Sequence, residues 1–108
     1  MQRLPITLAA ALLSLPAFAQ DSSTQMTGAG FSEACTRANE SWISFCNGYI
    51  QAAVDSVGKR DGICIPSGTT RTELVTVVEK AITGSDQLKA LNANEAVHFV
   101  MRKSYPCP

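Results

Sequence analysis

Four cysteines offer the main chemistry of this sequence. They are Cys35, Cys46, Cys64 and Cys107, in a chain of 108 residues. No Cys-x-x-Cys pair occurs, and zinc favours such closely spaced ligands, so the spacing argues against a metal site. The cysteines lie among apolar residues rather than beside a basic group, which disfavours a reactive thiolate. We therefore expect two disulfide bonds and no cofactor.

His98 is the only histidine, and so the only natural general base near neutral pH. Glu95 lies one helical turn before it and is placed to orient its ring. The sequence puts no serine or cysteine nucleophile beside this pair, and its glycines lack the spacing of a phosphate-binding loop. We interpret His98 as a boundary residue of a helix and expect no enzyme activity.

Residues 1–19 have the features of a signal peptide. Arg3 gives a positive start, an apolar run extends to Leu15, and Ala17-Phe18-Ala19 precedes the predicted cleavage between Ala19 and Gln20. The run is shorter than the ~20 residues that span a bilayer, which disfavours the alternative of a membrane anchor. Export into an oxidising compartment agrees with disulfide formation.

The mature chain is short enough for one domain with a marginal core that needs cross-links. Residues 20–30 are small and polar and predict a flexible lead, and residues 31–108 form the domain. The formal net charge of the full chain is zero, and no basic patch or cationic helix face is present. We therefore expect neither nucleic acid nor a membrane surface as a partner after cleavage.

Apolar residues recur at helical spacing from Phe31 to Val57 and predict one long helix. Gly30 or Ser32 would cap its start and Gly58 its end, with Asn39 as a candidate break.

The dipeptide Asn47-Gly48 favours an alternative, a β-hairpin. Helical spacing over about seven turns outweighs it, and a glycine inside a helix then implies that another backbone packs close to Gly48. The stripe of Trp42, Phe45 and Tyr49 is expected to lie in the core.

Capping residues in the second half of the sequence predict two or three shorter helices. Thr70 and Glu73 form a capping box before a helix that ends at Gly84, Asp86 caps a short turn, and Asn92 and Glu95 cap a last helix. The last helix directs apolar residues inward, namely Ala96, Val97, Val100 and Met101. The expected fold is an all-α, disulfide-stapled bundle with almost no β structure.

Distances along the long helix limit the cysteine pairs. Cys35 and Cys46 would lie ~16 Å apart on one straight helix, beyond the ~7 Å that a disulfide allows, unless the helix breaks between them. The chain after Val57 reaches back to Cys46 but not to Cys35, ~33 Å from the helix end. We therefore predict Cys46–Cys64 and Cys35–Cys107. A break at Asn39 would free Cys35 for another partner.

Three segments together resemble the Rap/Tai family of type VI secretion immunity proteins. They are Phe45-Cys46-Asn47-Gly48-Tyr49-Ile50, Ile63-Cys64-Ile65-Pro66 and Tyr105-Pro106-Cys107. Asp55 also fits the pattern, whereas Ala52-Ala53 and Gly84-Ser85-Asp86 depart from it.

This resemblance implies a periplasmic, all-helical protein that is not an enzyme. It implies a cognate peptidoglycan amidase effector as partner, blocked by a surface element inserted into its active-site groove, and a possible homodimer. Candidate contact residues lie in two predicted loops: Lys59, Arg60, Asp61, Ser67 and Thr69. Two other classes stay open, a periplasmic acid-stress chaperone and a hydrolase with an unrecognised site.

Overall fold

The computed structural model describes residues 2–3 and 25–108. The signal peptide apart from Gln2 and Arg3, its cleavage site, and most of the predicted lead therefore lie outside the described residues. Among the described residues, no helix is both long and apolar enough to cross a membrane.

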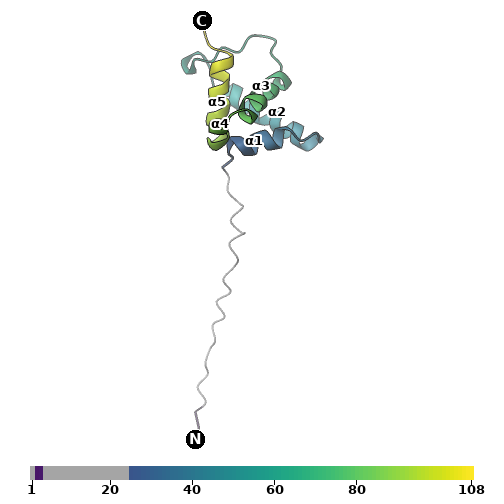
Figure 1. Cartoon of the computed structure of the whole chain (residues 1–108), viewed down its shortest axis with the longest axis vertical. Coiled ribbons are helices and arrows are strands. Elements are labelled where there is room, and N and C mark those ends of the chain that lie inside the picture. Colours follow the sequence, from purple (N-terminus) through teal and green to yellow (C-terminus); the bar gives the residue numbers. More distant parts are fainter. Residues whose placement is uncertain (1, 4–24) are drawn as a thin grey trace.

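The described chain is a helical bundle without strands, which confirms the all-α prediction. Its elements are α1 (Gly28–Cys35), α2 (Glu40–Asp55), the 3-10 helix η2 (Lys59–Asp61), α3 (Arg71–Thr83), α4 (Asp86–Ala90) and α5 (Ala93–Ser104). Pairing of β type is limited to isolated bridges in this part of the chain. Figure 1 shows α1 beside α4 at the foot of α5, and the connection from α2 to α3 at the opposite end of the bundle.

The single long helix predicted from Phe31 to Val57 is wrong, because the chain turns between Cys35 and Glu40. Asn39 has extended backbone angles, and its side chain accepts a hydrogen bond from the Trp42 amide at 3.0 Å. An N-cap of this kind starts a new helix instead of continuing the previous one. The turn lets the apolar faces of α1 and α2 meet the same core.

The first helix also begins earlier than predicted. Thr27 caps it, rather than Gly30 or Ser32, through a hydrogen bond from the Gly30 amide to the Thr27 hydroxyl oxygen. The last residues of the predicted flexible lead therefore belong to α1. Hydrogen bonds from Gly28 N to Leu91 O and from Ala93 N to Met26 O, both 2.8 Å, fix this end of the chain to the start of α5.

The helical interpretation of Asn47-Gly48 is confirmed, since both residues lie within α2. The expectation of a backbone packed against Gly48 is wrong, because a Cβ atom added there would meet nothing within 4 Å. The close approach occurs at Gly28 instead, where an added Cβ would overlap the carbonyl oxygen of Leu88. Glycine is thus required where α1 crosses the end of α4.

Capping in the second half follows the prediction in part. The Thr70 and Glu73 capping box starts α3, and Gly84 ends it. Ser85, not Asp86, caps α4 by accepting from Leu88 N at 3.2 Å. Asn92 caps α5 through the Asn94 amide at 2.9 Å.

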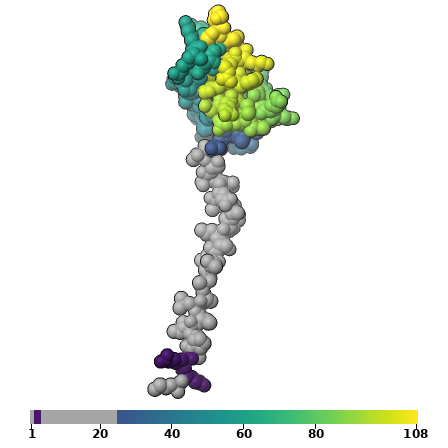
Figure 2. Space-filling model, turned by 90° about the vertical axis from the view of Figure 1, so that its left-hand side faces the viewer, coloured from purple at the N-terminus to yellow at the C-terminus, as the bar shows by residue number. Residues whose placement is uncertain are grey.

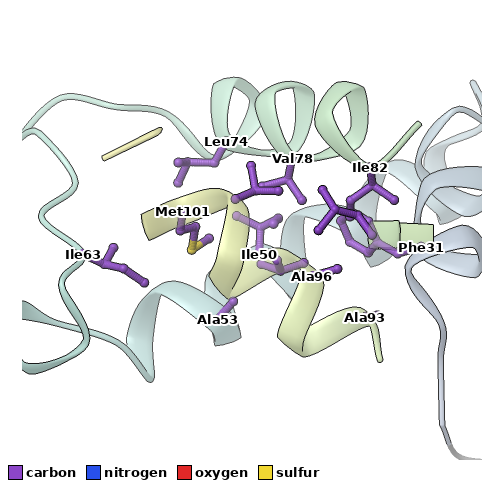
Figure 3. Packing of buried hydrophobic residues seen from close by; sticks show 13 residues of the cluster. Phe31, Ile50, Ala53, Ile63, Leu74, Val78, Ile82, Ala93, Ala96 and Met101 are labelled. Atoms are coloured by element: carbon purple, nitrogen blue, oxygen red, sulfur yellow. The ribbon is translucent and has the colours of Figure 1, made fainter. Parts of the chain in front are cut away.

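The core lies between α3 and the other long helices. In Figure 3, Leu74, Val78 and Ile82 point from α3 toward Ile50 and Met101. The inward residues predicted for α5 are all buried: Ala96, Val97, Val100 and Met101. The predicted core position of the aromatic stripe is wrong for Phe45, which is 38% exposed, and Trp42 lies outside the core cluster, whereas Tyr49 packs against it.

Candidate functional site

The cysteines pair as Cys35–Cys46 and Cys64–Cys107, so the predicted pairs Cys46–Cys64 and Cys35–Cys107 are wrong. The turn before Asn39 brings the Cα atoms of Cys35 and Cys46 to 5.7 Å, on two different helices. A straight helix would have kept them too far apart. Once these two sulfurs are joined, Cys64 and Cys107 are left for each other.

The second disulfide ties the connection between α2 and α3 to the end of the chain. Cys64 N donates to Tyr105 O at 2.8 Å, Cys107 N donates to Gly62 O at 3.3 Å, and Ile63 and Pro106 form an antiparallel bridge between these bonds. In Figure 2 this teal segment lies beside the yellow C-terminal residues. Residues 62–64 are therefore held by covalent and backbone bonds at once.

We define the connecting segment as residues 56–70, which holds all five predicted contact residues. The 3-10 helix η2 forms the first turn of this segment. Gly58 N donates to Asp61 Oδ2 at 3.0 Å, and Gly62 ends the turn with a φ of 74°, a conformation that favours glycine. Asp61 therefore shapes the turn, and its carboxylate is engaged within the protein.

Lys59 and Arg60 are the cations of this turn, and both are exposed. The Arg60 side chain is 84% exposed, and its Nε lies 3.5 Å from Asp61 Oδ2. An exposed ion pair of this kind contributes only ~0–1 kcal/mol, so it does not hold Arg60 away from a partner. Both side chains are therefore accessible at the surface of the connecting segment.

Ser67 and Thr69 lie in a second turn of the connecting segment. The Thr69 amide and hydroxyl both donate to Pro66 O, at 3.2 and 2.8 Å, and Gly68 has a φ of 89°. The Thr69 hydroxyl is thus used within the turn, whereas Ser67 is exposed. The structure places both turns in one segment but shows no hydrogen bond between them.

A pocket of about 360 Å³ lies beside the base of η2, between the end of α2 and the extended residues 63–65. Val54, Val57, Ile63 and Ile65 give it apolar walls. The prediction of contact residues did not include these positions. Two features of the sequence could have indicated these positions. Val54 and Val57 end the apolar stripe of the first predicted helix, and Ile63 and Ile65 flank Cys64.

His98 and Glu95 do not form a catalytic arrangement. Glu95 is exposed in the first turn of α5, and the buried Nε2 atom of His98 has no hydrogen-bond partner. Within the described residues no group of His, Cys, Asp or Glu side chains is arranged to hold a metal ion.

A row of aromatic rings extends from Phe31, which is buried in α1, to Trp42 at the start of α2. Ring centroids lie 5.2 Å apart for Phe31 and Tyr49, 6.0 Å for Tyr49 and Phe45, and 5.7 Å for Phe45 and Trp42. Arg37 lies over the Trp42 ring at 4.7 Å, a cation–π arrangement. Burial raises the pKa of the Tyr49 phenol above its ordinary value.

The family model of the Rap1a immunity proteins matches residues 27–107. No curated protein and no solved structure is significantly similar to the chain. The match begins at Thr27, the cap of α1, and ends at Cys107, the last cysteine of the second disulfide, so it spans the folded bundle. The chain therefore belongs to the Rap1a immunity protein family.

Proposed function

We propose that this protein binds a peptidoglycan amidase effector of type VI secretion in the periplasm and blocks its active-site groove with the connecting segment, residues 56–70. Membership of an immunity family supports binding to an effector. The two disulfides, with no free cysteine in the described chain, support an oxidising compartment. The features of a signal peptide in residues 1–19 support export.

One observation carries the choice of segment. The connecting segment presents exposed Lys59 and Arg60 on a short turn, while the residues just after that turn are fixed by the Cys64–Cys107 disulfide and by Cys64 N to Tyr105 O. A surface element that is already ordered loses little conformational entropy when it enters a groove. A cationic tip also directs binding toward an acidic or hydrogen-bond-accepting surface.

The experiment is co-purification of the oxidised protein with candidate cysteine-histidine amidases, followed by inhibition of peptidoglycan cleavage. The test variant is Lys59→Gln together with Arg60→Gln. We expect inhibition to weaken by tenfold or more, with an unchanged unfolding midpoint, because both side chains are exposed.

The matched control is Lys80→Gln together with Lys89→Gln, which removes the same charge from α3 and α4. We expect it to inhibit like the original protein. Equal weakening in both variants would point to long-range charge attraction and against the segment. Absence of binding to any amidase, with no protection of cells from the toxin, would reject the proposed function itself.

The proposal includes a homodimer formed through α2. Ile43 and Phe45 of this helix are 49% and 38% exposed, and contact with a second copy would remove this apolar surface from water. Sedimentation equilibrium of the protein and of Phe45→Ser tests this part. A monomer at all concentrations would reject the dimer and leave the effector proposal in place.

A further inference from the structure

A second and larger pocket lies away from the connecting segment, where α4 and the outer side of α5 meet the end of α3. Its volume is about 810 Å³, within the range of sites that hold small molecules. In Figure 2, α4 in lime and α5 in yellow lie side by side on one face of the protein. The pocket belongs to neither disulfide nor to the segment proposed to contact the effector.

The floor and walls of this pocket are mainly apolar. Leu88 and Val100 are buried beneath it, Ala81 and Leu91 are half-buried at its sides, and Phe99 is 41% exposed. An exposed phenylalanine next to other apolar side chains marks a surface that gains free energy when an apolar group covers it. The pocket therefore favours a ligand with an apolar body.

The charge at the pocket has one sign. Lys103 is its charged lining residue, and no carboxylate lines it. The Lys103 ammonium lies 5.9 Å from the centre of the Phe99 ring, and no ion pair is found for it among the described residues. The Ser85 hydroxyl is used to cap α4, so it does not compete for Lys103. A cation beside an apolar wall is complementary to an apolar body that ends in one anionic group.

We propose that this pocket binds a single-chain amphiphile with a carboxylate head, such as a medium-chain alkyl carboxylate. Its hydrocarbon chain lies on Leu88, Leu91 and Phe99, and its carboxylate pairs with Lys103. Removal of the chain from water supplies the main attraction, and the ion pair selects the sign of the head group.

A bilayer surface is a less suitable occupant. Binding to a membrane requires a helix with a wide apolar face bordered by several cations. Here α4 has only five residues and begins with an acid, Asp86. The proposal therefore commits to a free, single-chain molecule that enters the pocket.

The test is calorimetric titration of the oxidised protein with decanoate, 1-decanol and decyltrimethylammonium, with the site mapped by amide NMR shifts. We expect decanoate to saturate one site, to shift residues of α4 and α5, and to bind more tightly than the two other probes. Lys103→Gln should weaken decanoate by about threefold or more and leave 1-decanol unchanged. Phe99→Ala should weaken both probes.

Arg102→Gln is the matched control, because Arg102 occupies the same last turn of α5 but does not line the pocket. It should bind decanoate within about twofold of the original protein, as expected of an exposed charge that lacks direct contact with the ligand. The proposal is overturned if no probe saturates, or if Lys103→Gln and Arg102→Gln weaken decanoate equally. It is also overturned if decyltrimethylammonium binds as tightly as decanoate.

Other occupants of the pocket give different results. If pocket residues shift with protein concentration alone and decanoate does not bind, the pocket is a contact between two copies. If Phe99→Ala abolishes effector binding while decanoate does not bind, the pocket belongs to the effector interface. Either result overturns the proposal. Because the titration needs no effector, its outcome is independent of the proposed immunity function.

Discussion

The Cα atoms of Cys64 and Cys107 lie 4.8 Å apart, so the end of the chain is joined to the middle of the connection between α2 and α3. The two residues are 43 positions apart, and α3, α4 and α5 lie between them. This disulfide therefore closes the whole C-terminal half of the bundle into one loop and holds the base of the segment that we propose to contact the effector.

Removal of each disulfide should have a different cost. Chain entropy gives about 4 kcal/mol for the 43-residue Cys64–Cys107 separation and about 3 kcal/mol for the 11-residue Cys35–Cys46 separation. Urea unfolding of the Cys64→Ser/Cys107→Ser and Cys35→Ser/Cys46→Ser variants measures both. Hydrogen exchange at residues 62–65 should accelerate mainly in the first variant. Equal acceleration in both would contradict a local role for Cys64–Cys107.

Two glycines should respond to alanine in opposite directions. Gly28→Ala should lower the free energy of unfolding by about 1–3 kcal/mol, because its Cβ would overlap Leu88 O. Gly48→Ala should raise it by about 0.5–1 kcal/mol, because Gly48 lies in a helix with open space around it. Thermal and urea unfolding check both variants. A loss of stability in Gly48→Ala would mean that a partner backbone does lie against α2.

The turn between α1 and α2 depends on the side chain of Asn39. Asn39→Ala removes the acceptor for Trp42 N and should lower the free energy of unfolding by about 1 kcal/mol. Asn39→Asp keeps the acceptor and serves as the control, with stability close to the original value. If both variants lose equal stability, the hydrogen bond to Trp42 N is not the reason that α2 begins there.

Stability should fall at alkaline pH, partly through Tyr49. Burial raises the pKa of its phenol in the folded protein, so above pH ~10 the unfolded chain loses this proton first and is favoured. The contribution is therefore constant below about pH 10 and is lost as the pH rises through the raised folded-state pKa. Tyr49→Phe keeps the ring contacts and should show a smaller alkaline loss in urea unfolding. Tyr105→Phe is the control, because it leaves Tyr49 in place and should therefore show the same alkaline loss of stability through Tyr49 as the original protein.

Much of the bundle follows from local patterns in the sequence. The start of α3 was predicted from Thr70 and Glu73, its end from Gly84, and the buried face of α5 from the spacing of its apolar residues. Such features depend on residues within one or two turns of each other, so the sequence contains them directly. The contact residues were predicted only as loop positions. The structure shows that the side chains of Asp61 and Thr69 form hydrogen bonds within their own turns, whereas those of Lys59 and Arg60 are exposed.

The sequence by itself determined a small domain of amphipathic helices with enough cysteines for two cross-links. Tertiary structure decided where the first apolar stripe turns, and through that turn which cysteines meet. The helical spacing of apolar residues continues across Asn39. A straight helix and two helices joined by a turn would both show this spacing, because each arrangement buries one face of the helix, so the pattern does not distinguish them. The packing of α1 against α3, α4 and α5, with Gly28 in close contact with Leu88 of α4, makes the folded-back arrangement the one that buries Phe31.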